Sequence, residues 1–270
     1  MNNFSKAVIF LLFLSKTGFS FHDTLTISFT IGNRIIMPFR KHYIEKLPLK
    51  NSLHNFYGMS KVTNNVSYYN PFFEIRKRHI LKNKKFYLNS YLGIQYITLS
   101  NSKVGEWDNY SQGPAWSYFK GTQYNTKNEL TPYLGGMFGY KLFNFEDLLL
   151  TTNFHIRVDY PAQMTFTNRF IGMNNTSNNI DELNRSTISY SNFDIISFGS
   201  INMKYKLSQH FFASSDFNIP FFYLLDIYKD PSVDPYNYSY NTPSYILDYR
   251  SSIFNINYLT INLSVNYQFK

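Results

Sequence analysis

The stretch LTINLSVNYQF at residues 259–269 decides the fold class of this chain, because apolar and polar residues alternate in it without a break. Successive side chains of a β-strand point to opposite faces, so this spacing predicts a strand with one apolar and one polar face. The alternation lasts for 11 residues. That length matches the roughly 9–11 residues that a tilted strand needs to cross a bilayer.

The same period of two recurs along the rest of the chain. It is clear at residues 24–31 and 148–160, where Phe154, Ile156 and Val158 share one face and polar residues the other. It is weaker in five further segments, at residues 66–79, 86–99, 134–142, 193–207 and 211–221. Tyr, Phe, Ile and Thr favour pleated surfaces, and no amphipathic helix competes with them. The sequence therefore predicts eight strands.

The connections between these segments alternate strictly in length. Three are of hairpin size, at residues 82–85, 144–147 and 208–210, and four are long, at about 38–65, 101–129, 161–187 and 223–251. A strand protein spans hydrocarbon only as a closed cylinder, because every backbone polar group there needs a partner. The pattern predicts an all-β fold: a closed antiparallel up-and-down transmembrane β-barrel of about eight strands, with short periplasmic turns and long extracellular loops. Closure would pair residues 24–31 with residues 259–269.

Composition excludes several other classes of protein. No apolar stretch reaches the roughly 18 residues of a membrane helix, and 27 Phe with 24 Tyr supply more apolar surface than a disordered chain contains. The chain has no cysteine, which removes disulfides, thiolate zinc sites, cysteine nucleophiles and a lipidated cysteine. The formal net charge of +9 comes from scattered residues without a base-stacking motif, so lipid phosphates rather than nucleic acid are the expected counter-charges.

The first 20 residues have the pattern of a secretory signal peptide. Lys6 precedes the apolar run at residues 7–14, and small residues at Gly18 and Ser20 suit a signal peptidase. We therefore expect residues 1–20 to be a cleaved signal, residues 21–270 to be the barrel domain, and the location to be the outer membrane of a Gram-negative bacterium.

A barrel of eight strands has an interior filled by side chains. The facing pattern predicts an interior polar network of Glu74, Arg76, Arg78, His155, Arg157, Asp159 and Asp216. Because unpaired buried charge is costly, we expect Arg157 and Asp159 to pair with residues on adjacent strands. Gly135, Gly136 and Gly139 lie within a strand and are expected to relieve crowding or permit a bend.

With its signal peptide, its eight alternating segments, three short turns, four long loops and the ending VNYQFK, the chain resembles small outer-membrane β-barrel proteins of the type of the outer-membrane protein A transmembrane domain. The resemblance lies in architecture and covers nearly the whole exported chain. It implies insertion by the barrel-assembly machinery, which reads an aromatic residue at the end of the last strand. Phe269 would be that assembly signal, although Lys270 follows it.

The sequence gives little indication of a metal site or of catalytic residues. None of the six histidines has a metal-ligand spacing, so no metal and no cofactor are expected. His155 shares a polar face with Arg157 and Asp159, and a histidine, a carboxylate and a serine are the parts of an acyl hydrolase. A hydrogen-bonded interior histidine is the reading we favour, because no glycine-flanked serine is evident.

Recognition, if any, is expected in the long loops. Rigid aromatic residues among small polar ones are typical of recognition surfaces, and the headgroup layer is an equally good explanation of them. The candidates are Trp107, Tyr110, Trp116, Tyr118, Tyr236, Tyr238 and Tyr240.

The function that these features favour is that of a non-enzymatic outer-membrane protein, acting in surface interaction or as an accessory subunit of an envelope or secretion complex. The expected partners are outer-membrane lipid or lipopolysaccharide, the barrel-assembly machinery and an envelope protein. Three alternatives stay open: a barrel-embedded lipid-modifying hydrolase or acyltransferase, a porin-like small-solute pore if there are ten or more strands, and a soluble secreted β-sandwich.

Overall fold

The computed structural model describes residues 26–46, 59–81, 85–109, 117–160, 163–174, 180–188, 194–224 and 258–269. The predicted signal at residues 1–20 lies outside them. No helix in the described ranges is long and apolar enough to cross a membrane. The described residues form one antiparallel sheet of twelve strands. They are β1 (Thr26–Pro38), β2 (His42–Lys46), β3 (Met59–Asn64), β4 (Pro71–Ile80), β5 (Phe86–Asn109), β6 (Ser117–Phe145), β7 (Leu148–Asp159), β8 (Gln163–Asn174), β9 (Ile180–Ile188), β10 (Asp194–Lys206), β11 (Phe211–Leu224) and β12 (Tyr258–Phe269).

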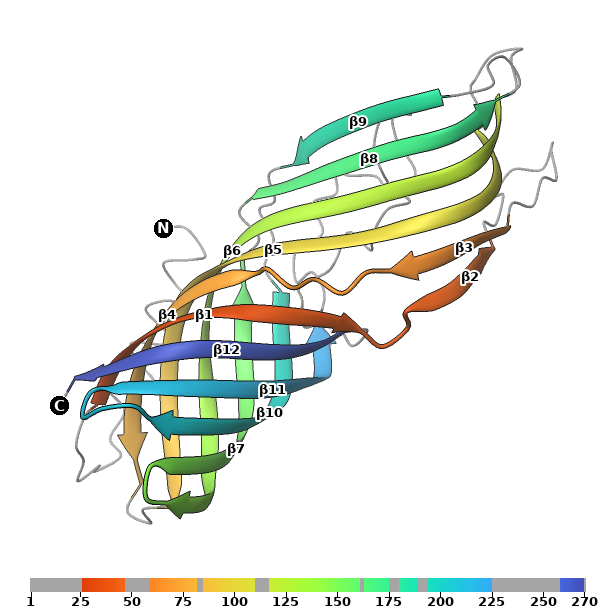
Figure 1. Ribbon diagram of the computed structural model, residues 1–270. Helices are drawn as coiled ribbons and strands as arrows, with labels where there is room; N and C mark the ends of the chain where they lie inside the picture. Colours follow the sequence, from red (N-terminus) through yellow and green to blue (C-terminus); the bar gives the residue numbers. More distant parts are fainter. Residues whose placement is uncertain are drawn as a thin grey trace.

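Eight of these strands pair in a ring, in the order β1, β4, β5, β6, β7, β10, β11 and β12. The first and last strands close it, with Ile27 opposite Phe269 at one end and Pro38 opposite Tyr258 at the other. Figure 1 shows β12 running alongside β1. Each ring strand overlaps one of the eight predicted segments, so the predicted all-β fold with eight ring strands is confirmed, while β2, β3, β8 and β9 were not predicted.

Most polar residues of the ring strands are buried inside and most apolar ones lie on the outside, apart from a buried apolar cluster of Ile36, Ile97, Leu99, Ile196 and Phe198. On β7 the side chains of Asn153, His155 and Arg157 are buried, whereas Phe154 and Ile156 are 45% and 54% exposed. On β12 the polar set at Thr260, Asn262, Ser264 and Asn266 is buried, whereas Leu263 and Val265 are each about half exposed. This distribution is the reverse of the one in a soluble sandwich, where apolar faces pack against each other.

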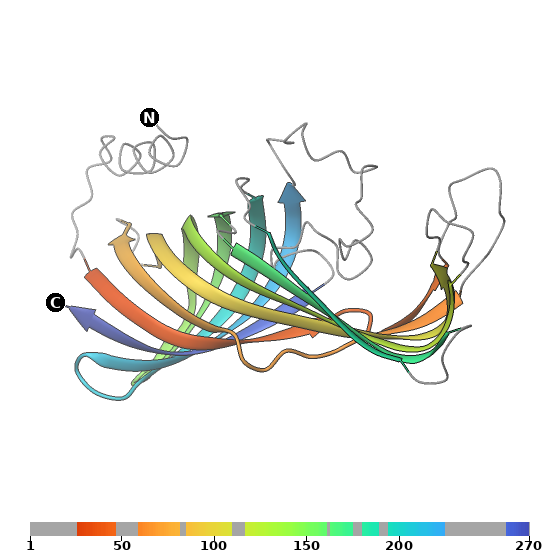
Figure 2. The same cartoon turned by 90° about the horizontal axis from the view of Figure 1, so that it is seen from above.

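Beyond the ring, the sheet continues as a six-stranded extension. β5 and β6 pair from Phe86 opposite Tyr140 to Asn109 opposite Ser117, far past the ring. β3 and then β2 add to one side of this hairpin, and β8 and then β9 add to the other. In Figures 1 and 2 the extension leaves the ring as a curved sheet, on the side away from the C-terminus.

The extension corrects the prediction of four long loops. Residues 38–65 contain β2 and β3, residues 101–129 are largely the outer parts of β5 and β6, and residues 161–187 contain β8 and most of β9. The fourth connection, at 223–251, lies almost entirely outside the described residues. The reason is chemical: the stretch TQYNTKNE at 122–129 is mostly polar on both faces, so it carries no period in hydrophobicity although its backbone is paired.

Candidate functional site

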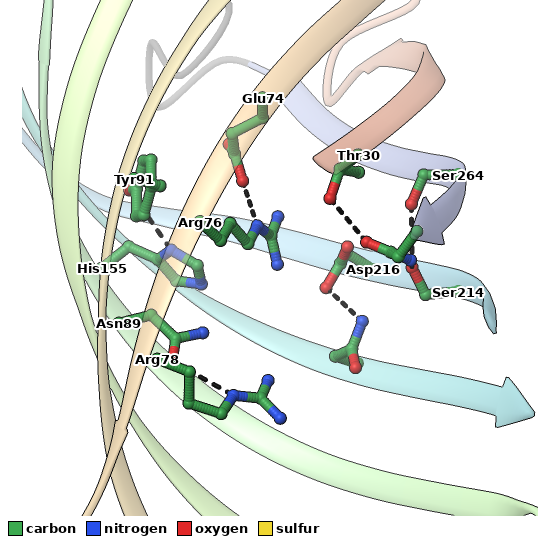
Figure 3. A network of polar contacts seen from close by, with 12 residues as sticks. Thr30, Glu74, Arg76, Arg78, Asn89, Tyr91, His155, Ser214, Asp216 and Ser264 are labelled. Carbon is green, nitrogen blue, oxygen red and sulfur yellow. Dashed lines mark hydrogen bonds and ion pairs between the residues drawn. The ribbon is translucent and has the colours of Figure 1, made fainter. Parts of the chain in front are cut away.

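The ring interior holds a first group of charged side chains around Glu74. Arg76, two residues along β4, forms an ion pair with Glu74, and the Tyr133 hydroxyl of β6 donates to Glu74 Oε2 at 3.1 Å. Figure 3 shows Glu74 and Arg76 inside the ring, near Tyr91 and His155. The Glu74 carboxylate is buried and satisfied from two strands.

A second ion pair joins Arg157 and Asp159 of β7. Two nitrogens of the guanidinium bind the two carboxylate oxygens, and both side chains are buried. The pair forms within one strand, whereas the sequence analysis expected partners on adjacent strands; residues two apart share a face, and an arginine is long enough to bridge them. The neighbouring strand contributes Tyr133, whose ring centroid lies 4.0 Å from the Arg157 guanidinium carbon.

The two remaining charged residues of the predicted network have neutral partners. Arg78 Nε donates to Asn89 Oδ1 at 3.2 Å and its guanidinium lies over the Tyr87 ring, and Asp216 accepts from Asn202 Nδ2 at 2.6 Å. All seven predicted residues therefore face the interior. Sequence reasoning missed Arg34, which binds Gln95 and donates to the Tyr133 hydroxyl at 3.3 Å.

Tyrosines over glycines fill the middle of the ring. Tyr87, Tyr91 and Tyr133 form a buried cluster with Met137. A Cβ atom at Gly135 would lie 2.6 Å from the Tyr91 ring, and one at Gly139 would overlap the Tyr87 ring. These two glycines make room for aromatic rings from the neighbouring strand, which is the close packing that relieves crowding.

His155 is held by neutral groups. Its Nε2 lies 3.0 Å from Ser200 Oγ, its Nδ1 lies 3.4 Å from the Tyr91 hydroxyl, and its ring stacks on Phe198 with centroids 4.2 Å apart. An acyl hydrolase needs a carboxylate to orient the histidine and a path for substrate to the serine. Here a tyrosine hydroxyl occupies the orienting position, and both His155 and Ser200 are buried inside the ring. The geometry is that of a structural hydrogen-bond network.

The described residues contain no group of three histidine or carboxylate side chains that could hold a metal ion.

The predicted recognition aromatics fall into two sets. Trp107 and Tyr118 lie in β5 and β6, with Trp107 opposite Phe119 and Tyr118 opposite Asp108, so these two are strand residues and not loop residues. The reason is that two strands can pair through their backbones without an apolar face, so this part of the sheet carries no period in hydrophobicity. Tyr110, Trp116, Tyr236, Tyr238 and Tyr240 lie outside the described residues.

One face of the extension is exposed across all six strands. It continues the outer surface of the ring, because Val104 and Tyr124 have the same parity as the outward residues Leu92 and Leu130 on β5 and β6. A register row crosses it from strand to strand: Ile44, Lys61, Val104, Thr122, Ile171 and Asp181. We call this surface the outer face of the extension.

An exposed ion pair joins the last two strands on that outer face. Arg169 of β8 donates to both carboxylate oxygens of Asp181 on β9, at 2.9 and 2.8 Å. The hydrogen bond from Arg169 lowers the pKa of the Asp181 carboxyl from its ordinary value, and the same contact raises the pKa of Arg169. Both side chains are about half exposed, so salt screens this pair.

Phe269 ends β12 at the short-turn end of the ring. Its ring meets Phe29 of β1 edge-on, with centroids 5.2 Å apart, and Tyr267 at 4.7 Å. This aromatic residue at the end of β12 thus lies where β12 pairs with β1 and closes the ring.

Comparison with known proteins gives structural neighbours only. No protein-family model and no curated protein matches the sequence. Two crystal structures of Ail, the attachment invasion locus protein of Yersinia pestis, match the fold with a TM-score of 0.31 each; one is a complex with the heparin analogue sucrose octasulfate. The identities are 8% and 10%, over 92% of this chain and 100% of each Ail chain.

Proposed function

We propose that this chain is a non-enzymatic outer-membrane protein whose ring lies in the lipid bilayer and whose extension acts in interactions outside the cell. The observation that carries the proposal is the inverted ring: Ile156, Ile201 and Val265 are about half exposed while Asn153, Arg157 and Asn266 are buried. Exposed apolar side chains all around a ring are costly in water. In hydrocarbon they are at no disadvantage.

Backbone pairing supports the same environment. Within lipid an open sheet edge is not viable, because each unpaired N–H or C=O group is costly there. The ring has no such edge, since β1 and β12 pair along twelve residues. The edges of the extension, at β2 and β9, lie outside the ring, where water can satisfy them.

The orientation follows from the connections. The short turns after β4, β6 and β10 lie at the same end of the ring as the start of β1 and the end of β12. We assign this end to the periplasm. The extension then faces outward. A leader at residues 1–20 would export the chain, and the barrel-assembly machinery would insert it with Phe269 at the end of the last strand. The expected partners are lipid or lipopolysaccharide around the ring and a protein bound by the extension, within an envelope or secretion complex or on another surface.

The alternatives receive less support. The ring of described strands has eight members, below the ten or more that a small-solute pore requires, and its interior is filled by tyrosines and ion pairs. A lipid-modifying enzyme centred on His155 would need lipid to reach Ser200, which is buried inside the ring. The surface-interaction role is therefore the one we carry forward.

Flotation of reconstituted protein tests the proposal. The full exported chain, mixed with phospholipid vesicles, is expected to float with them and to resist extraction by carbonate. On gels, the unboiled folded ring is expected to migrate differently from the boiled chain. Protein that stays at the bottom of the gradient and migrates identically before and after boiling would contradict the membrane location.

A further inference from the structure

The edge strand β9 carries a pattern that neither the ring nor the proposed membrane location explains. Among the described strands β9 pairs with β8 alone and ends the sheet. An edge strand presents a row of unpaired N–H and C=O groups to any strand that approaches it. On the outer face its side chains are Asp181, Leu183 and Arg185, all exposed, with Leu183 at 62%.

These three residues are complementary to themselves. If a second copy of β9 approaches antiparallel with Leu183 opposite its counterpart, Asp181 of each copy lies opposite Arg185 of the other. Opposite charges placed directly across an antiparallel pair are attractive, and the exposed leucines would bury each other. Shifting the pairing so that Leu183 lies opposite Arg185 removes both charge pairs, so the pattern selects one register.

Existing contacts prepare the charges for this pairing. Arg169 already orients the Asp181 carboxylate through two hydrogen bonds. Arg185 forms no ion pair with any other described residue. Pairing would place Arg185 of the second copy beside the Asp181 carboxylate of the first copy, which Arg169 of the first copy already holds in position. Charged residues on an edge strand usually prevent its association with other sheets. An acidic and a basic residue four positions apart attract an antiparallel copy of the same strand and disfavour strands that carry other charge patterns.

We propose that β9 is a self-association site, through which two copies of this chain join their extensions into one continuous antiparallel sheet. The strands of the extension continue β5 and β6 away from the ring (Figure 2). Antiparallel pairing of β9 therefore places the two rings at opposite ends of the joined sheet. This part of the inference rests on the proposed function: with each ring in a bilayer, the two copies belong to facing membranes.

Cysteine cross-linking tests the pairing in detergent, without any membrane. The chain has no cysteine, so Leu183→Cys gives a single reactive thiol. Residues directly opposite in an antiparallel pair have Cβ atoms about 4.5–5.5 Å apart, so a short bis-maleimide is expected to produce covalent dimers. Ile171→Cys is the matched control, because Ile171 is also exposed on the outer face but lies one strand further in. Three strand spacings, roughly 14 Å, separate it from Thr167 of the second copy, and its own counterpart lies four residues further along, roughly 20 Å away. Equal cross-linking at both positions, or none at residue 183, would overturn the proposal.

Vesicle clustering tests the charge pattern and the facing membranes. Asp181→Arg and Arg185→Asp chains are reconstituted in vesicles of two colours. Each variant alone places like charges opposite each other and is expected to lose clustering. The mixture restores both charge pairs and is expected to cluster in two colours, as is the double variant D181R/R185D alone. Wild-type clustering with no rescue in the mixture would overturn the register.

Failure of the proposed function gives a different result. Protein that does not float with vesicles contradicts the membrane location, while the Leu183→Cys test in detergent still decides whether β9 pairs with itself. Protein that floats but leaves wild-type vesicles dispersed overturns the facing-membrane contact and leaves the membrane location intact. Cross-linking of Leu183→Cys chains to Ile44→Cys chains in preference to themselves would assign the edge to β2 and overturn self-pairing.

Discussion

Arg157 and Asp159, two residues apart on β7, bind each other through two hydrogen bonds in the ring interior, and the ring of Tyr133 lies against the guanidinium. Both charged groups are fully buried. Such a pair contributes little net stability relative to well-packed apolar residues, because both ions are desolvated. Loss of one partner is a different matter, since it leaves an uncompensated charge.

Removing one side of this pair should therefore destabilise the ring more than removing both. We expect Asp159→Ala to reduce the free energy of unfolding by about 3–5 kcal/mol, and the double variant R157M/D159L to lose much less. Urea titration of the folded protein in detergent, followed by heat-modifiable migration, measures both. An Asp159→Ala chain as stable as the wild type would show that the charge is hydrated.

A methyl group on Gly135 should be harmful, whereas one on Gly136 should not. A Cβ at Gly135 would meet the Tyr91 ring at 2.6 Å, but one at Gly136 finds only a backbone oxygen, at 4.0 Å. We expect Gly135→Ala to lose about 1–3 kcal/mol, in the range of overpacked cores, and Gly136→Ala to be neutral. The same urea titration compares them. Equal effects at the two positions would contradict the packing of tyrosine over glycine.

The ring could be predicted because the face on which a residue lies, inside or outside, decides whether that residue is polar or apolar. Ile261, Leu263 and Val265 face outward and alternate with buried polar residues, so hydrophobicity itself has a period of two. The extension could not be predicted in this way. On the outer face of β6 Tyr124 lies among Thr122, Thr126 and Asn128, and the other face carries the buried Lys127 and Glu129, so both faces are mostly polar there.

The contacts of the interior depend on register, which the sequence does not state. His155 meets Ser200 because β7 and β10 pair with His155 opposite Phe198. Arg34 was missed because Gly32 and Asn33 end the hydrophobic alternation of the first strand, although the inward parity continues through Thr30, Arg34 and Ile36. The face on which a side chain lies can be deduced from the sequence of one strand, whereas its hydrogen-bond partners depend on how two strands pair.

A lysine on the outside of the ring should cost more than a lysine on the outside of the extension. Ile201 on β10 and Val104 on β5 are each 51% exposed and both face outward. Under the proposed membrane location Ile201 lies in lipid, where a lysine near the midplane costs about 2–4 kcal/mol. We expect Ile201→Lys to reduce vesicle insertion strongly and Val104→Lys to insert normally, measured by flotation. Normal insertion of both would place the ring surface in water.

The pairing of β8 with β9 should weaken at low pH. Arg169 lowers the pKa of Asp181, so the folded state binds this proton less readily than the unfolded state. The contribution of the pair is complete above the ordinary aspartate pKa and is lost as the pH falls through the lowered value. Hydrogen exchange of β8 and β9 amides, corrected for intrinsic rates, is expected to increase in that range. Asp181→Asn should remove this pH dependence, and an unchanged profile in that variant would assign the effect to another group.

His155 and Ser200 should matter for stability and not for lipid chemistry. His155→Ala removes the hydrogen bonds to Ser200 and Tyr91 together with the stack on Phe198, so we expect a loss of about 1–3 kcal/mol from the hydroxyls left without a partner. Ser200→Ala should lose less, because His155 keeps Tyr91. The measurements are urea unfolding and mass spectrometry of the lipids after incubation with each protein. Fatty acid released or transferred by the wild type and abolished in both variants would show an enzyme, and unchanged lipid with all three proteins would support a structural role for this pair.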